Sequence, residues 1–142
     1  MKYCVLYFTR TNTSKRVAEK IPAKLSSPIV QITDNKNWSG PFGYIKAGFY
    51  STVKKPVEIE LLGDPCEPDE YIVVTPLWAG GIAPAGQAFL KTIPPDKVHL
   101  VVVSLGSKVE DREGYLSVND VIDQLKNEDQ VIDNLVNTIK EK

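Results

Sequence analysis

The chain has 142 residues, of which 42% are hydrophobic and 25% charged, and its formal net charge is −1. These values exclude a disordered tail, a collagen-like repeat and a disulfide-stapled miniprotein, and they fit a single domain over residues 1–142. Two cysteines and one histidine leave few ligands for a zinc site, so no metal is expected. No signal-peptide pattern and no membrane-length apolar run is visible, so we expect a soluble, cytoplasmic protein.

The two halves of the chain carry opposite charge. Residues 1–55 hold ten Lys or Arg and two acidic residues, a net charge of +8, whereas residues 56–142 hold seven and sixteen, a net charge of −9. Such an asymmetry is typical of a protein with a charged ligand or partner. The alternative is that both halves mix evenly on the folded surface.

The first half of the chain alternates apolar strands with helices. Residues 3–8 form an apolar run typical of a buried strand. After polar residues 9–14, apolar residues recur at helical spacing from Val17 to Leu25, with Pro22 interrupting and Thr13 or Ser14 as a suitable cap. Four further elements are expected here: a strand over 28–32, a loop over 35–43, a helix over 44–53 and an extended segment over 57–61.

The second half continues the alternation. A buried strand over 71–75 is expected to end at Pro76 and to lead through a loop over 77–84 into a helix over 85–93. A further strand is expected over 98–104. Residues 116–126 are either a helix or an edge strand, and we favour an extended segment near 119–124. The last helix is expected to start within 127–130.

Buried strands that alternate with helices predict a parallel sheet covered on both faces, with right-handed crossovers. The predicted fold is therefore a doubly wound α/β three-layer sandwich with four to five parallel strands. Ligands bind such sheets beyond the carboxyl ends of the strands. Three polar loops follow buried strands at that edge: residues 9–14, 76–83 and 104–115.

The first loop is suited to an anion. It carries four hydroxyl side chains, one amide and Arg10, and it leads into the amino terminus of a helix, whose free N–H groups and dipole favour negative charge. No carboxylate occurs between Met1 and Glu19. The glycine-rich patterns of Walker and dinucleotide-binding loops are absent, which favours a monophosphate over a nucleoside triphosphate. An ordinary capped helix start is the alternative.

The other two loops are suited to a planar ring. Trp78 follows a central strand beside two glycines, which permit close approach of a flat ligand. The third loop contains Gly106, Tyr115 and acidic residues. Inward packing of Trp78 and a solvated third loop are the alternatives.

Residues 4–11 also match the phosphate loop of tyrosine phosphatases, Cys-x5-Arg-Thr. That loop needs an exposed thiolate and a curled backbone, whereas Cys4 precedes Val-Leu-Tyr-Phe in a buried strand. Receiver-type signalling domains need acidic residues at the strand ends, and the ends here are Thr9 and Thr75. Both interpretations are therefore disfavoured.

Over residues 1–105 the chain resembles the flavodoxin family, particularly its short single-domain members. Residues 7–19 look like the family's phosphate loop and first helix, commonly Phe-Ser-Arg-Thr-Gly-Asn-Thr followed by Lys-Lys-Val-Ala. Val73–Gly80 looks like its flavin loop, often Thr-Pro-Val-Trp-Ala-Gly. Beyond residue 105 the likeness fades, because the fourth crossover helix is shortened or missing. Asn12 stands where the family has Gly, and Thr13 where it has Asn.

The resemblance implies FMN as cofactor. The residues implied around its phosphate are Thr9, Arg10, Thr11, Asn12, Thr13 and Ser14. The residues implied on one side of the ring are Pro76, Leu77, Trp78, Ala79 and Gly80. Those implied on the other side are Ser104, Leu105, Gly106, Ser107 and Tyr115. The flavin does the redox chemistry, so no catalytic side chain is expected.

The implied function is that of an electron-transfer flavoprotein, monomeric or weakly dimeric, without affinity for nucleic acid or membranes. A redox partner protein would dock on an acidic face near the flavin, formed by Asp64–Glu70 and Glu110–Glu113. The basic face would lie at the phosphate loop, with Arg10, Lys15 and Arg16. An FMN-dependent NAD(P)H:quinone-type reductase and an accessory module with weak or lost FMN binding are the alternatives.

Overall fold

The computed structural model describes most of the chain. The described residues are 2–8, 13–25, 27–33, 60–62, 68–78, 81–106, 108–109 and 114–140. The loop expected over 35–43 and the helix expected over 44–53 lie outside them.

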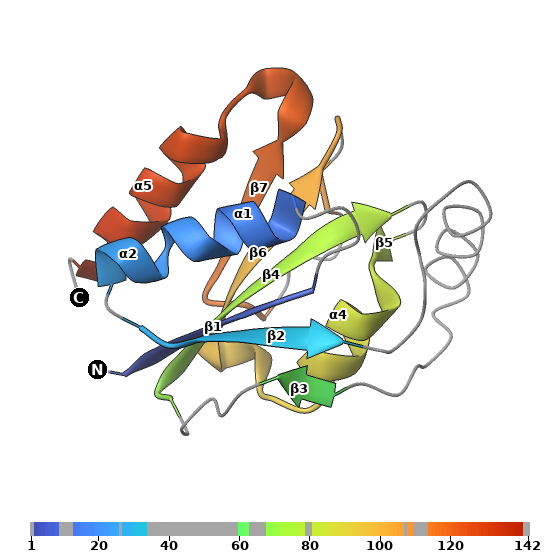
Figure 1. Cartoon of the computed structure of the whole chain (residues 1–142), viewed down its shortest axis with the longest axis vertical. Helices are drawn as coiled ribbons and strands as arrows, with labels where there is room; N and C mark the ends of the chain where they lie inside the picture. The colour runs from blue at the N-terminus through green and yellow to red at the C-terminus, as the bar shows by residue number, and fades with distance from the viewer. Residues whose placement is uncertain are drawn as a thin grey trace.

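A mainly parallel sheet forms the centre of the molecule (Figure 1). Five strands are parallel, in the spatial order β2-β1-β4-β6-β7. Their bounds are Tyr3–Tyr7 for β1, Ile29–Thr33 for β2, Glu70–Trp78 for β4, Val98–Ser104 for β6 and Ser117–Ile122 for β7. Two short strands are antiparallel: β3 (Glu60–Leu62) extends the sheet beyond β2, and β5 (Gly81–Ile82) pairs with the end of β4.

The order of the parallel strands identifies the fold. Counted along the chain, the five are the second, first, third, fourth and fifth parallel strands, which is the flavodoxin-like order of doubly wound α/β domains. The predicted fold class is therefore confirmed. The winding direction reverses between β1 and β4, and this switch point is where folds of this type bind ligands.

Helices cover both faces of the sheet (Figure 1). One face carries α1 (Thr13–Lys20), α2 (Pro22–Leu25) and α5 (Glu128–Lys140), and the other carries α4 (Pro84–Leu90). Side chains alternate between the two faces along each strand. In β6, Val101 and Val103 pack on the α1 and α5 side, whereas Leu100 and Val102 pack on the α4 side. Every residue of β6 is buried, as expected of a strand covered on both faces.

The helices follow the predicted apolar spacing. The helix expected from Val17 to Leu25 is divided at Ile21, because Pro22 lacks an N–H group and instead starts α2. α5 begins within the predicted range and buries one apolar stripe. This stripe consists of Ile132, Leu135, Val136 and Ile139.

The prediction that a strand ends at Pro76 is wrong, because β4 continues to Trp78. The Val74 carbonyl accepts the last bond from β1, at 3.0 Å from the Phe8 N–H, and β1 does not reach Pro76. The next bond of this parallel ladder would run from residue 76 to the Phe8 carbonyl, and Pro76 has no N–H to donate, so the pairing with β1 ends here while β4 continues beside β6. The Pro76 carbonyl accepts the Ala83 N–H at 3.1 Å, so the predicted loop over 77–84 contains the β4–β5 pair.

The connection from β6 to β7 confirms the shortened C-terminal part. Its described residues form no helix; Val109 is buried, and its N–H donates to Asp120 Oδ1 at 3.2 Å. Residues 117–122 form β7, and a short 3-10 turn, η2 (Asp123–Leu125), follows. Of the two alternatives for residues 116–126, a helix or an edge strand, the structure has the strand. It begins two residues before the extended segment expected near 119–124.

Gly86 lets α4 approach the end of β4 closely. A Cβ atom at this position would lie 2.4 Å from Thr75 Oγ1 and 3.0 Å from Thr75 Cβ. Real Cβ atoms do not approach so closely, so no larger residue fits without a shift of α4. Gly86 thereby sets the position of the hairpin that joins β4 to α4.

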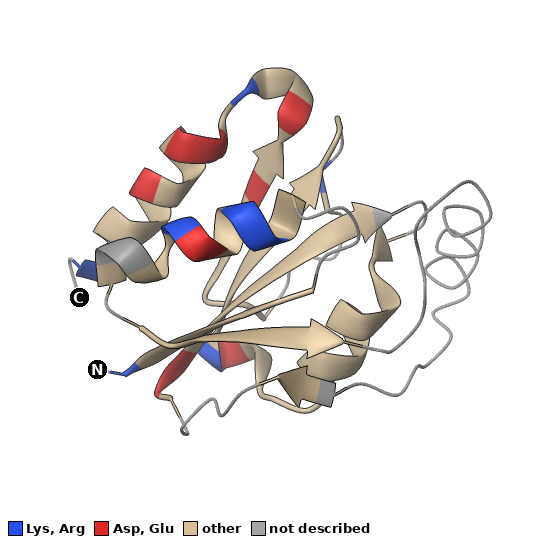
Figure 2. Ribbon diagram, in the orientation of Figure 1, with Lys and Arg blue, Asp and Glu red and all other residues tan. Residues whose placement is uncertain are grey.

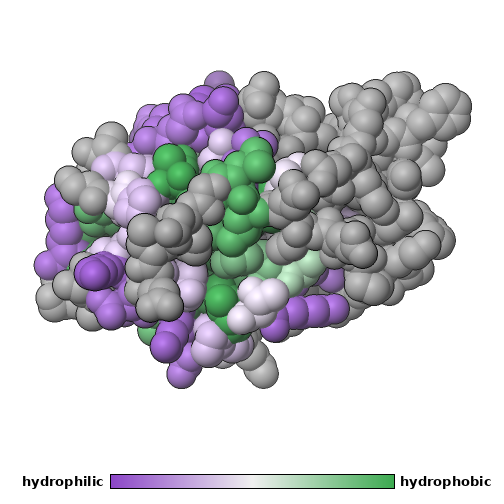
Figure 3. Space-filling view, turned by 60° about the horizontal axis from the view of Figure 1, so that its bottom comes forward, coloured by the Kyte–Doolittle hydropathy of each residue, from purple (hydrophilic) through white to green (hydrophobic). Residues whose placement is uncertain are grey.

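Apolar side chains reach the surface at the β2–β3 edge, where Ile29 and Leu62 are exposed. Figure 3 views the side that carries β2, β3 and α4 and shows apolar surface between polar side chains. Among the described residues, none of the helices has the length and apolar character needed to cross a membrane.

Candidate functional site

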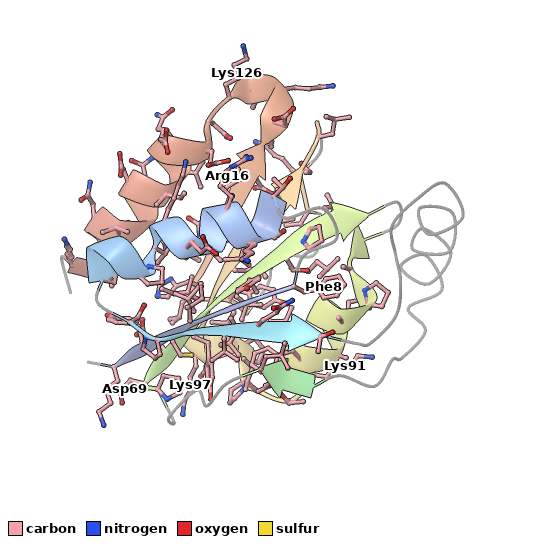
Figure 4. All side chains as sticks on the ribbon, in the orientation of Figure 1. Phe8, Arg16, Asp69, Lys91, Lys97 and Lys126 are labelled. Atoms are coloured by element: carbon pink, nitrogen blue, oxygen red, sulfur yellow. The ribbon has the colours of Figure 1, made fainter. Side chains whose placement is uncertain are left out.

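The carboxyl ends of the parallel strands meet at one edge of the sheet, which carries the candidate site. Phe8 follows β1 at this edge, and Trp78, Ser104 and Ile122 end β4, β6 and β7. Figure 4 shows Phe8 at this edge and Asp69 at the opposite, amino-terminal edge. β1 contributes Tyr7, whose phenol pKa is raised by burial and secondarily by the charge of Glu19, so it stays neutral.

The start of α1 is free of negative charge. Thr13 is half-buried, Ser14 is 1% exposed, and the first turn holds no acidic residue. The first N–H groups of a helix have no partner within it, so this turn can donate to an anion. Of the six residues predicted around a phosphate, these two are described. The other four, Thr9, Arg10, Thr11 and Asn12, lie outside the described residues.

The β4–β5 hairpin forms the second part of the edge. Pro76 and Leu77 are half-buried within β4, and Leu77 pairs with Ile82 across the hairpin. Gly81 has φ +142°, which side-chain-bearing residues rarely adopt. Trp78 closes β4, and the structure describes its backbone alone. The predicted ring contacts Ala79 and Gly80 lie outside the described residues.

Gln87 of α4 is a site residue that the sequence analysis missed. Its Nε2 donates to the Ile82 carbonyl at 2.5 Å and so ties α4 to the returning strand of the hairpin. A lone glutamine in an amphipathic helix carries no sequence signal for this role.

The end of β6 forms the third part of the edge. Ser104 is buried, whereas Leu105 is 68% exposed. The Gln124 N–H donates to the Leu105 carbonyl at 2.9 Å, and a Cβ on Gly106 would lie 2.5 Å from Gln124 Oε1. The η2 turn therefore lies against the predicted third loop. Ser107 lies outside the described residues.

The structure does not bring Tyr115 to this edge. β7 runs parallel to β6, so the chain must first return to the amino-terminal edge, where the Leu116 N–H donates to the Val98 carbonyl at 2.8 Å. Tyr115 is half-buried there and packs against the core on the α4 side. Its predicted position beside the ring is wrong.

Of the acidic face predicted near the ring, Asp69 and Glu70 do not lie at the carboxyl edge. Asp69 and Glu70 open β4 at the amino-terminal edge, where Asp69 Oδ2 accepts the Lys2 N–H at 2.7 Å. Residues 63–67 and 110–113 lie outside the described residues. Asp123 of η2 is an exposed acid at the carboxyl edge.

Two basic residues of α1, Arg16 and Lys20, pair with α5, whereas Lys15 pairs with Glu19 of α1 itself. Glu128 accepts from Arg16 at 2.7 Å and from Lys20 at 2.5 Å, and Lys20 also donates to Asp129 at 2.8 Å. Figure 2 shows these charges side by side on the two helices, and Figure 4 shows Arg16 between them. The opposite charges of the two chain halves thus meet partly inside one molecule, and Arg16 is already partnered.

Replacing Glu128 by glutamine should lower the free energy of unfolding at pH 7 by about 1 kcal/mol, since Arg16 is largely exposed and the pair is screened. The hydrogen bond from Arg16 is the main cause that lowers the pKa of Glu128. Its stabilisation is therefore present above the ordinary carboxylate pKa and is lost as pH falls through the lowered value. In urea unfolding, the difference between the two proteins at pH 7 should shrink as the pH falls below the ordinary carboxylate pKa; a constant difference would contradict this.

Three solved structures share the fold over nearly the whole chain. A flavoprotein from Lactobacillus acidophilus, crystallised in complex with FMN, has 18% sequence identity and a TM-score of 0.64, covering 91% of this chain and 97% of that chain. A protein from Bacteroides eggerthii described as a flavoprotein has 18% identity and a TM-score of 0.69, covering 99% of both chains. A third, from Bacteroides uniformis and described in the same way, has 18% identity and a TM-score of 0.66, covering 94% and 97%.

The three likenesses establish the fold of this chain. No protein-family model matches it, and no curated protein sequence does either. The similarity is therefore carried by the arrangement of the strands and helices.

Proposed function

We propose that this protein binds FMN at the switch point between β1 and β4 and acts as an electron carrier. The observation that carries the proposal is the flavodoxin-like strand order, which places the start of α1 and the β4–β5 hairpin beside that switch point. A structural neighbour crystallised with FMN supports it.

The described residues fit the two ends of such a ligand. The first turn of α1 offers amides that have no partner within the helix, and the hydroxyls of Thr13 and Ser14, to a phosphate, with no acidic residue in that turn. Leu77 and the exposed Leu105 offer apolar contacts to a planar ring from β4 and from the end of β6. FMN would supply the redox chemistry, while these side chains bind, orient and shield it from water.

Flavin uptake tests the proposal directly. The purified protein should be yellow, or should take up added FMN with quenching of flavin fluorescence. A colourless protein that binds no added FMN would overturn it and favour the accessory-module interpretation. Steady oxidation of NAD(P)H by the isolated holoprotein would instead favour the quinone-reductase interpretation.

We further propose that a basic redox partner docks at the carboxyl edge beside β6 and η2. Leu105 and Leu125 are 68% and 64% exposed, and the Gln124–Leu105 hydrogen bond holds their backbones together. Exposed Asp123 adds negative charge beside them. An apolar centre with a charged rim is typical of protein-binding surfaces.

Replacing Leu125 by serine should slow electron transfer to such a partner about tenfold, because a few apolar anchors dominate most interfaces. FMN affinity of the same variant serves as the control and should equal that of wild type, since Leu125 is not among the residues proposed to contact the ring. Raising the salt concentration should slow transfer by the wild-type protein as well. If neither the substitution nor the added salt changes the rate of electron transfer, this edge is not the docking surface.

A further inference from the structure

The β4–β5 hairpin, which is proposed to line one side of the flavin ring, has little backbone pairing of its own. β5 consists of two residues, and its register with β4 is the two pairs Leu77–Ile82 and Trp78–Gly81. A two-stranded hairpin is at best marginally stable alone. Contacts from outside the hairpin are therefore needed to fix where β5 lies.

The helix α4 supplies such contacts through one residue. Gln87 is the only polar residue in the sequence of α4, which otherwise consists of Pro, Ala, Gly, Phe and Leu. Its Nε2 donates to the Ile82 carbonyl at 2.5 Å, and its backbone N–H donates to the Ala83 carbonyl at 3.0 Å. Gln87 thus binds the last residue of β5 and the residue that follows it.

The Gln87 amide also lies against the first residue of β5. A Cβ atom built on Gly81 would be 3.9 Å from Gln87 Nε2, which is an ordinary van der Waals distance. Because the Ile82 carbonyl only accepts, the amide presents its NH₂ group and not its oxygen to β5. One half-buried side chain therefore contacts both residues of β5 and donates to one of them.

The same helix is fixed on the strand that begins the hairpin. Gly86 precedes Gln87 and packs so closely on β4 that a Cβ would lie 2.4 Å from Thr75 Oγ1. The Ala83 N–H closes the hairpin by donating to the Pro76 carbonyl at 3.1 Å. α4 thus rests on β4 through Gly86 and holds β5 through Gln87, so the two strands keep one relative position.

This position decides how a ring would fit beside the hairpin. Leu77 of the hairpin and Leu105 at the end of β6 are the apolar contacts proposed for the ring, and β4 and β6 are neighbours in the sheet. A wall that is already in place does not have to be ordered when the ligand binds, so less entropy is lost on binding. A hairpin released from α4 would lose this advantage.

We infer that Gln87 is a positioning residue for flavin binding, which holds the β4–β5 hairpin in its ring-binding position before the ligand arrives. This role rests on the proposed function, whereas the hold on the hairpin is a property of the ligand-free protein. Gln87 acts through the hairpin, so its loss should weaken binding of the ring and leave binding of the phosphate unchanged.

Hydrogen exchange of the ligand-free protein tests the hold on the hairpin. Gln87→Met keeps an unbranched side chain of similar size but removes the donor. The Ala83 N–H should then exchange about fivefold faster than in wild type, because the net contribution of one hydrogen bond is lost. The N–H groups of β6 should keep their rates. Gln130→Met on the exposed surface of α5 is the matched control and should exchange as wild type.

Titration with two flavins tests the consequence for binding. Gln87→Met should bind FMN about fivefold more weakly than wild type. It should lose the same factor for riboflavin, which has the ring but no phosphate. Thr13→Asp should instead weaken FMN far more than riboflavin, because its charge repels the phosphate. Gln130→Met should bind both flavins as wild type does.

Three results would overturn the inference. They are wild-type exchange at Ala83 in Gln87→Met, wild-type affinity for FMN in that variant, and a loss for FMN that riboflavin does not share. Gln87→Glu is the second variant, since a carboxylate cannot donate to the Ile82 carbonyl. Its exchange at Ala83 and its riboflavin affinity should change at least as much as in Gln87→Met, and smaller changes would also contradict the role of the donor.

Failure of the proposed function gives a different result. A wild-type protein that binds neither flavin would overturn the proposed function and, with it, the role of Gln87 in flavin binding. Exchange at Ala83 in the ligand-free variants would still decide whether Gln87 holds the hairpin.

Discussion

A Thr13→Asp substitution should lower the affinity for FMN about 100-fold while leaving the ligand-free protein at least as stable as wild type. Thr13 is the first residue of α1, in a turn without acidic residues. A carboxylate there would favour the helix dipole by about 0.5 kcal/mol. A bound phosphate, in contrast, would meet a like charge, and at about 5 Å each pair of charges costs about 3 kcal/mol near a protein surface.

The Thr13→Asp variant is informative because its affinity for FMN should fall while its free energy of unfolding without ligand should not. Fluorescence titration with FMN gives the affinity, and urea unfolding of the ligand-free protein gives the stability. Thr13→Asn keeps the size of the aspartate without its charge and should bind far better than Thr13→Asp. Asn134→Asp adds the same charge on the exposed side of α5 and should bind like wild type. If Thr13→Asp binds FMN as tightly as wild type, the phosphate of FMN does not bind at the start of α1.

Replacing Gly86 by alanine should destabilise the fold by about 2 kcal/mol, although alanine is the better helix former by about 1 kcal/mol. The reason is the 2.4 Å approach between the new Cβ and Thr75 Oγ1 at the end of β4. Either α4 moves away or β4 distorts, and both responses disturb the packing that positions the hairpin. Urea unfolding measures the change.

Thr75→Ala tests whether the contact with Thr75 Oγ1 is the cause of the destabilisation. It removes the hydroxyl that the new methyl group would strike, so the double variant Thr75→Ala/Gly86→Ala should be more stable than the sum of the two single effects by about 1 kcal/mol. Strictly additive effects would show that the clash is relieved elsewhere. A Gly86→Ala protein that is more stable than wild type would mean that helix propensity outweighs the contact.

Local patterns predicted most of the fold because each strand is a short apolar run between polar segments. The strand at residues 3–8, the strand at 98–104 and the start of α5 lie within a residue or two of their predicted positions. Pro76 misled the prediction, because its missing N–H ends only the pairing with β1, whereas the other side of β4 stays paired with β6 up to Val103. Which neighbouring strand a proline faces depends on the register of the sheet, which no local pattern contains.

The candidate site was harder to predict than the fold. Thr13, Leu77 and Ser104 lie at one edge of the sheet because each follows or ends a parallel strand, which the strand pattern alone implies. Tyr115 does not, because a fifth parallel strand forces the chain back to the opposite edge before β7 begins. The bonds of Gln87 and Gln124 depend on how α4 and η2 dock, so no spacing in the sequence announces them.

The strand order also sets the sequence in which the site can assemble during folding. Contacts between β6 and β7 close short loops, as between His99 and Ser117, 18 residues apart, whereas β1 joins β4 only by closing loops such as that from Lys2 to Asp69, 67 residues apart. Longer loops cost more entropy to close, so short-range pairing is favoured early and β1 is favoured late. The switch point between β1 and β4 would then be the last part of the sheet to exist. A ligand that binds there would recognise only chains that have completed folding, and its binding would report the final step.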